Sequence, residues 1–127
     1  MIGINDVWRQ FDSPLMPDQV DITMFEEKLE ALIVKTLPSI KGLILATPFY
    51  LEPNREEPLR AMMDQYGAVV KKLAEKYDAV CVDVQTAFDR YLEHLPTQTL
   101  CHDRVHPNQT GHMIIAKTFV DALGFSW

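Results

Sequence analysis

The stretch GLILAT at residues 42–47 decides the fold, because it is a short and continuously apolar run between polar segments. Runs of this kind are typical of parallel β-strands that are covered on both faces. A second run, AVCVDV, occupies residues 79–84. Two such strands with a helical segment between them predict an α/β fold built on a parallel sheet.

Helical periodicity accounts for the segments that precede and separate these two strands. Within residues 19–37, apolar residues recur at helical spacing, and residues 23–26 (TMFE) have the form of a capping box. Residues 48–58 contain three prolines and predict a loop. One apolar face then marks a helix that ends near Lys76.

Two more helices are expected after the second strand. Residues 86–94 are compatible with a short helix, whereas residues 95–107 have neither a helical nor a strand period and predict a polar loop. Asn108 is a suitable N-cap for a last helix. Gly124 lies where a glycine commonly ends a helix.

The first residues, IGIND at positions 2–6, read as the end of a buried strand that runs into a loop. Strands usually have about five or six residues and a lead-in. The first strand therefore looks truncated, and we expect an incomplete sheet whose N-terminal strands are absent.

Composition and charge exclude several classes of partner. The chain has 127 residues and a formal net charge of −6, with 12 Lys and Arg against 18 Asp and Glu. No basic cluster is denser than Lys71-Lys72. Nucleic acids and anionic membranes need a basic surface, so we expect neither as a partner. No window reaches the roughly 18 consecutive apolar residues of a membrane span.

The two cysteines, Cys81 and Cys101, form neither a disulfide framework nor a four-ligand zinc site. We expect both thiols to be reduced. Reduced thiols and an acidic charge together favour a cytoplasmic location.

Polar and aromatic side chains follow each predicted strand. In open parallel sheets, ligands bind outside the carboxyl ends of the strands, so these residues are candidates for a site. They are Asn5, Asp6 and Trp8 after the first strand, Pro48, Phe49 and Tyr50 after the second, and Asp83, Gln85 and Thr86 after the third. Asp103 and His106, in the loop before the last helix, belong to the same side.

Asp103 lies three residues before His106 in a segment that Pro107 prevents from continuing as a regular helix. A turn there can bring the carboxylate to the imidazole Nδ1, which leaves Nε2 to take a proton from a nucleophile. Taken alone, this spacing also fits a capping or surface pair. Gly3 and Asn5 are similarly ambiguous, because both residue types are common in turns.

The combination of Gly3-x-Asn5-Asp6 with Asp103-x-x-His106 and the following Pro-Asn resembles the SGNH (GDSL-type) hydrolase and esterase family. The resemblance covers essentially all 127 residues. It implies a three-layer, flavodoxin-like parallel sheet with helices on both faces. It also implies that Asn5 is an oxyanion-hole donor, that His106 is the general base and that Asp103 orients it.

One part of the family pattern is missing, namely the Gly-Asp-Ser-Leu-like block with the nucleophilic serine. The chain's serines, Ser13, Ser39 and Ser126, do not lie in such a context, and Cys101 lies on the same loop as the base. We therefore expect residues 1–127 to be a single domain that forms the C-terminal part of such a hydrolase and is nearly inert alone.

The remaining expectations concern ligands and partners. The substrate is expected to be a small acyl or acetyl ester, such as an acetylated sugar, and no cofactor is expected. Pairing with the missing N-terminal segment, or homo-oligomerisation through an open sheet edge, is expected as well. The substrate-binding candidates are Gly3, Asp6, Trp8, Phe49 and Tyr50.

Two other functions remain open from the residues alone. His102 and His106 have the spacing of a helical zinc site, with Asp103 and either Cys101 or His112 as further ligands, but Pro107 opposes the helix that such a site needs. Alternatively, the chain is a noncatalytic α/β scaffold that self-associates through an open sheet edge.

Overall fold

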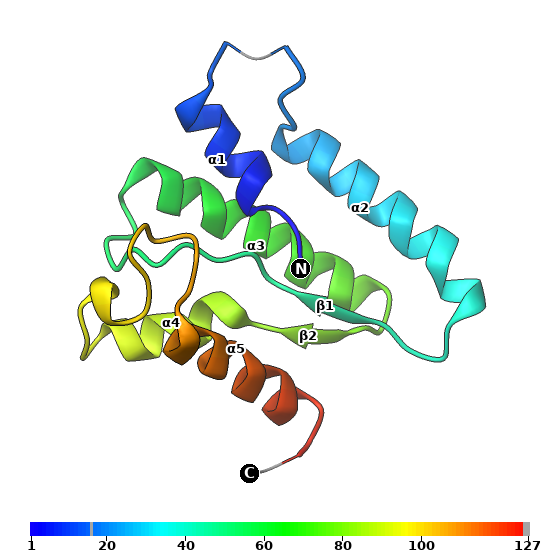
Figure 1. Ribbon diagram of the computed structural model, residues 1–127. Helices are drawn as coiled ribbons and strands as arrows, with labels where there is room; N and C mark the ends of the chain where they lie inside the picture. The colour runs from blue at the N-terminus through cyan, green and yellow to red at the C-terminus, as the bar shows by residue number, and fades with distance from the viewer. Residues whose placement is uncertain (16, 126–127) are drawn as a thin grey trace.

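The computed structural model in Figure 1 describes residues 1–15 and 17–125. Within these residues, a parallel pair of strands carries five α-helices and two short 3-10 turns. The elements are α1 (Ile4–Asp12), α2 (Ile22–Thr36), η1 (Leu37–Ser39), β1 (Ile44–Ala46), α3 (Pro58–Lys76), β2 (Val80–Val82), α4 (Val84–Leu92), η2 (Thr97–Thr99) and α5 (Gln109–Ala122). The prediction of an α/β fold with a parallel sheet is confirmed.

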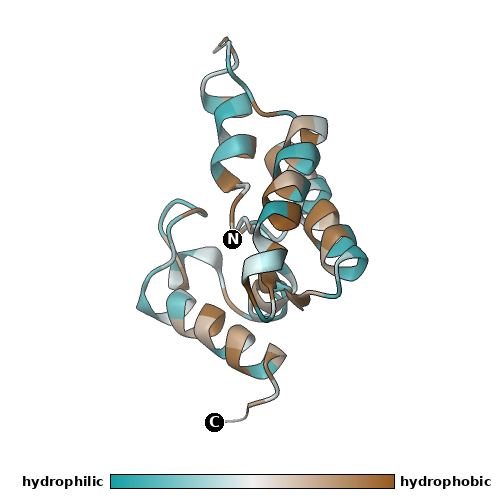
Figure 2. Cartoon of the chain, turned by 90° about the vertical axis from the view of Figure 1, so that its right-hand side faces the viewer, coloured by the Kyte–Doolittle hydropathy of each residue, from teal (hydrophilic) through white to brown (hydrophobic). Residues whose placement is uncertain are grey.

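The two strands separate two hydrophobic clusters. Leu45 of β1 packs with residues of α2 and α3, whereas Ala46, the next residue, packs with residues of α4 and α5. Successive strand residues point to opposite faces, so helices contact the sheet from both sides, as Figure 1 shows. Figure 2 marks hydrophobic residues along α5, and one of the hydrophobic residues of this helix, Met113, is 52% exposed. In the part of the chain described, no helix is both long and apolar enough to cross a bilayer.

Side-chain caps explain where α2, α4 and α5 begin. Asn108 caps α5 as predicted, because its Oδ1 accepts a hydrogen bond from the Gly111 N–H at 3.1 Å. The predicted capping box at residues 23–26 is wrong. Instead, the Asp21 carboxylate accepts from the Met24 N–H at 2.8 Å, which starts α2 one residue before Thr23. Asp83 caps α4, so this helix begins two residues before the predicted start at 86.

The prediction that residues 2–6 are the end of a strand that runs into a loop is wrong. The described chain has no regular structure before Ile4, where α1 begins. Gly3 has a φ of 124°, which ends any extended run, and its carbonyl accepts a hydrogen bond from the Val7 N–H at 3.1 Å. The residue that was expected to follow a strand therefore precedes a helix. Asn5 and Asp6 lie in the first turn of α1 rather than in a loop.

Gly3 is also a point of close packing, and this gives a testable prediction. A Cβ at Gly3 would lie 3.1 Å from Cγ of Pro48, in a backbone conformation that disfavours side chains. We expect Gly3→Ala to lower the free energy of unfolding by about 1–3 kcal/mol, measured by urea denaturation. Gly42→Ala is the control, because a Cβ there meets nothing within 4 Å. Equal stability of the two variants would contradict the prediction.

Candidate active site

The loop between η2 and α5 brings Asp103 and His106 together, as the sequence predicted. The His106 Nδ1 lies 2.5 Å from the Asp103 Oδ2. The other carboxylate oxygen, Oδ1, accepts hydrogen bonds from the backbone N–H groups of Val105 at 3.0 Å and His106 at 2.8 Å. Asp103 thus holds both the imidazole and the turn that carries it.

This loop is closed at its base by a backbone bridge and by the side chain of Asn108. Cys101 and Pro107 form an antiparallel bridge. The Asn108 N–H donates to the Leu100 carbonyl at 2.8 Å, and the Asn108 Nδ2 donates to the Thr99 carbonyl at 2.9 Å. Because the Asn108 Oδ1 also caps α5, one side chain joins the base of the loop to the helix. We call residues 101–107 the His106 loop.

The electrostatics of the pair suit a base. The hydrogen bond to His106 and the N–H groups of His106 and Val105 hold the pKa of Asp103 well below its usual range. Asp103 therefore stays ionised at neutral pH, and a carboxylate facing Nδ1 keeps the proton on that nitrogen. The His106 side chain is 71% exposed, so Nε2 is accessible to a reactant.

The lowered pKa of Asp103 predicts a pH dependence of stability. A carboxyl whose pKa falls on folding contributes stability above its unfolded pKa of about 3.9, and this contribution is lost as the pH falls towards the folded pKa. We expect Asp103→Asn to lower Tm at pH 7, with a difference from the wild type that shrinks between pH 4 and pH 2.5. Calorimetry at these pH values measures it. A difference that stays constant over this range would contradict the prediction.

Helix α1 meets the His106 loop through Trp8. The Trp8 and His106 rings are in edge contact, with centroids 6.1 Å apart and planes at 70°. Asn5 lies three residues before Trp8, so it shares this face of α1, and its side chain is exposed. The structure therefore brings a tryptophan and an amide to the side of the helix that faces the imidazole.

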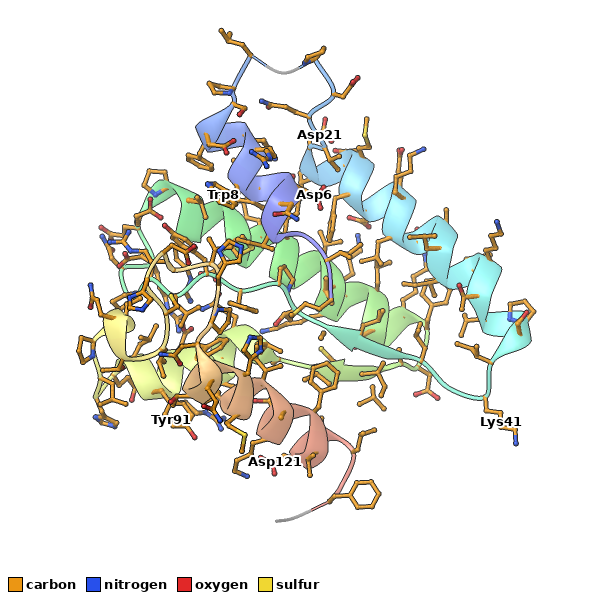
Figure 3. All side chains as sticks on the ribbon, viewed as in Figure 1. Asp6, Trp8, Asp21, Lys41, Tyr91 and Asp121 are labelled. Carbon is orange, nitrogen blue, oxygen red and sulfur yellow. The ribbon has the colours of Figure 1, made fainter. Side chains whose placement is uncertain are left out.

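Asp6 and Gly3 lie away from that face. In Figure 3, Asp6 and Trp8 point to different sides of α1. Burial raises the pKa of Asp6, although a backbone hydrogen bond opposes this. The negative charge of Asp6 contributes to raising the pKa of the Tyr66 hydroxyl on α3. Gly3 packs against Pro48. These two substrate-binding candidates lie where α1 packs on the rest of the chain.

Phe49 and Tyr50 are buried rather than presented to solvent. Phe49 is 6% exposed and packs on Phe88, with ring centroids 4.9 Å apart. Tyr50 is 8% exposed and shares a hydrophobic cluster with Val105 of the His106 loop. Of the aromatic candidates, Trp8 alone has a ring contact with His106 in the described residues.

The sequence reasoning missed a buried polar network beside the His106 loop. Arg60 is 1% exposed and bonds to Asp64 and Asp89, and Glu52 pairs with Arg104. One signal was available. Arg60 lies three residues before Met63, on the apolar face of the predicted helix, and a charged residue there needs buried partners.

Of the described serines, Ser39 lies far from the His106 loop. Ser39 belongs to η1, at the opposite end of the molecule from this loop in Figure 1. Ser13 follows the last turn of α1, and Ser126 lies outside the described residues.

Metal ligands do not converge either. Within residues 1–15 and 17–125, no group of three or more His, Cys, Asp or Glu side chains is placed to hold a metal ion. The zinc alternative therefore has no ligand set in this part of the chain.

Comparisons with known proteins give consistent matches. The model of the GDSL-like lipase/acylhydrolase family matches residues 1–114. An acetylxylan esterase of Geobacillus stearothermophilus is 49% identical over 128 positions, which include 100% of this chain and 58% of the relative. The chain thus spans little more than half the length of the curated relative that it matches.

Solved structures show the same likeness. The crystal structure of Axe2, an acetylxylan esterase of Geobacillus stearothermophilus, matches with a TM-score of 0.97 and 49% identity over 100% of this chain and 58% of that one. LAE5, an alpha/beta hydrolase from the metagenome of Lake Arreo in Spain, matches with a TM-score of 0.95 and 52% identity, over 98% and 57% of the two chains. Axe2 has also been solved as catalytic mutants in which a serine, an aspartate or a histidine is replaced by alanine. That aspartate and that histidine are separated by two residues, as are Asp103 and His106.

Proposed function

Because the chain belongs to the GDSL-like lipase/acylhydrolase family, we propose that it carries the base and an oxyanion donor of a serine esterase. His106 is the general base, Asp103 orients it, and Asn5 donates to the oxyanion. The observation that carries the proposal is the Asp103–His106 pair, with Nδ1 bound at 2.5 Å and an imidazole that is 71% exposed. The catalytic aspartate and histidine of Axe2, with the same spacing, support it.

The chemistry follows that of other serine hydrolases. Nε2 of His106 takes the proton of a serine hydroxyl as its oxygen attacks the acyl carbonyl carbon. The amide of Asn5 donates a hydrogen bond to the resulting oxyanion, and one such donor contributes about 3 kcal/mol to the transition state. Protonated His106 then gives its proton to the departing alcohol. A water molecule, deprotonated by the same imidazole, releases the acid and regenerates the serine.

The serine itself is proposed to come from polypeptide outside these 127 residues. Ser39 lies at the other end of the molecule from His106. In Axe2, a serine is replaced in one of the catalytic mutants, and this chain covers only 58% of the Axe2 chain. In the same proposal, the additional polypeptide supplies strands that complete a three-layer, flavodoxin-like sheet. In the described part of the chain β1 pairs with β2 alone, and Ile44 is 40% exposed, so an edge is open to a further strand.

The proposed substrate is a small acyl ester, and an acetylated sugar fits best. Related structures are described as acetylxylan and acetyl-xylooligosaccharide esterases. Trp8 supports this choice, because its half-buried indole beside His106 offers a flat apolar surface with a polar edge.

A direct test measures hydrolysis of p-nitrophenyl acetate. The chain is assayed alone and after addition of the Axe2 polypeptide that precedes the matched region. We expect a rate in the mixture only. A rate from the chain alone that survives Ser13→Ala and Cys101→Ala would contradict the proposal. No rate in a mixture that elutes as a complex would instead favour a noncatalytic, self-associating scaffold, for which the open edge of β1 is the supporting feature.

A further inference from the structure

The segment from Tyr50 to Glu52 runs between α4 and the His106 loop, and Gln85 of α4 holds it on one side. The Gln85 Oε1 accepts a hydrogen bond from the Tyr50 N–H at 2.8 Å, and its Nε2 donates to the Tyr50 carbonyl at 3.2 Å. These are the two bonds that a neighbouring strand would make. Gln85 is 7% exposed, so the segment is fixed by a buried side-chain amide.

Arg60 of α3 holds the next part of the same segment. Its Nη1 donates to the Glu52 carbonyl at 2.5 Å, and its Nη2 donates to the Asp89 Oδ2 at 2.7 Å. The other oxygen of Asp89, Oδ1, accepts from the Gln85 Nε2 at 2.9 Å. Asp89 therefore links the two side chains that hold the segment. In the part of the chain described, no buried side-chain polar atom lacks a partner.

On its other side, the segment is bound to the His106 loop. The Leu51 N–H donates to the Arg104 carbonyl at 3.0 Å, and the Glu52 Oε2 lies 3.0 Å from the Arg104 Nη1. Arg104 has a φ of 67°, a left-handed conformation that non-glycine residues adopt only when their surroundings hold them. Arg104 follows Asp103 directly, so its backbone orientation sets where the carboxylate and the imidazole lie.

We propose that Gln85 is a positioning residue of the proposed esterase, which fixes the Asp103–His106 pair through residues 50–52 and Arg104. This inference rests on the proposed function for its catalytic meaning, although the mechanical link stands without it. Gln85 touches neither His106 nor Asp103. Its effect passes through backbone hydrogen bonds, which is why the base can be 71% exposed and still be held in one orientation.

Two substitutions at Gln85 separate its roles. Gln85→Glu keeps the shape and the acceptor for the Tyr50 N–H. It removes both donors, however, and places a carboxylate oxygen against the Tyr50 carbonyl and the Asp89 carboxylate. Gln85→Leu removes every hydrogen bond of the side chain. The control is Arg55→Ala, which breaks a contact of 3.2 Å to the same Asp89 from a side chain that is 70% exposed.

Amide hydrogen exchange of the 127-residue chain tests the mechanical link. In both Gln85 variants we expect the Leu51 and His106 amides to exchange at least about tenfold faster, while amides of α2 change by less than about twofold. Arg55→Ala is expected to leave all of them unchanged. The proposal is overturned if the Leu51 and His106 amides keep their wild-type rates, or if α2 accelerates equally, because that result reports a global loss of stability.

A second measurement connects the link to catalysis. In the assembled esterase, Gln85→Glu is expected to lower kcat by about tenfold to a hundredfold and to change KM by less than about twofold, because a displaced base affects the chemical step more than binding. If the exchange result holds and no esterase activity is found, the positioning role stands and the proposed function fails. If the assembled protein is active and neither exchange nor kcat responds to Gln85→Glu, the positioning role fails alone.

Discussion

In the proposed esterase, assembled with the polypeptide that carries the serine, His106→Ala is expected to lower kcat at least about a thousandfold, with little change in KM. Loss of a general base that also protonates the leaving group removes both proton transfers of the acyl-transfer cycle. The residual rate would come from the oxyanion donors and from substrate binding. Hydrolysis of p-nitrophenyl acetate at pH 8 under saturating substrate measures the effect.

A matched control and a pH profile sharpen this expectation. His94→Ala removes another exposed histidine, at the end of α4, and is expected to keep full activity. In the wild type, kcat/KM should fall on mild acidification, because a protonated imidazole cannot accept the proton of the nucleophile. The lowered pKa of Asp103 keeps that carboxylate ionised throughout, so it adds no second limb there. Equal activity of His106→Ala and the wild type would exclude His106 as the base.

Arg60→Met is expected to lower the free energy of unfolding by about 3–5 kcal/mol, because it leaves the largely buried Asp89 carboxylate, 15% exposed, without its cation. Arg60 is 1% exposed and binds Asp89, Asp64 and the Glu52 carbonyl. Burial opposes its charge, but the hydrogen bonds and charges of the two aspartates outweigh this and raise the pKa of the guanidinium. The arginine therefore stays charged at every pH at which the protein is folded.

Urea denaturation measures the loss, and the structure supplies two comparisons. Arg55→Met removes a side chain that also contacts Asp89 but is 70% exposed. It is expected to change the free energy of unfolding by less than about 1 kcal/mol. The double variant Arg60→Met with Asp89→Leu should recover part of the loss, because it also removes the unpaired carboxylate. A loss below about 1 kcal/mol for Arg60→Met would show that water replaces the guanidinium.

Local patterns predicted those parts of the fold that depend on neighbouring residues. The strands at 44–46 and 80–82 lie within the two apolar runs, and α3 ends at Lys76 where its apolar face ends. The Asp103–His106 contact also followed from sequence spacing, since the carboxylate of Asp103 binds groups only two and three residues away. Short-range interactions of this kind are fixed by the local sequence.

The prediction of an N-terminal strand failed because it was based only on the apolar character of the first residues. Ile2 and Ile4 alternate with Gly3 as in a strand, but the φ of Gly3 and the bond from the Val7 N–H start a helix. Similarly, the sequence alone does not tell which of the aromatic candidates Trp8, Phe49 and Tyr50 lie in the core, whereas the structure buries Phe49 and Tyr50. These outcomes depend on contacts between segments that are distant in the sequence.

The network of Arg60, Gln85 and Asp89 shows the same limit. Gln85 is 35 residues from Tyr50, and Arg60 is 29 residues from Asp89. No periodicity pairs such positions. The sequence identified Gln85 as a residue that follows a strand, but only the fold shows that its amide replaces a neighbouring strand.

The closed base of the His106 loop also determines which residues of the loop can be substituted without moving α5. Asn108 ties the two ends of the loop together and at the same time starts α5. The side chain of His102, an exposed loop residue, can therefore vary while the helix keeps its register. Variation at His102 is therefore expected to leave the Asp103–His106 pair, the contacts of Arg104 with residues 51–52, and the hydrophobic clusters that Cys101 and Val105 join untouched.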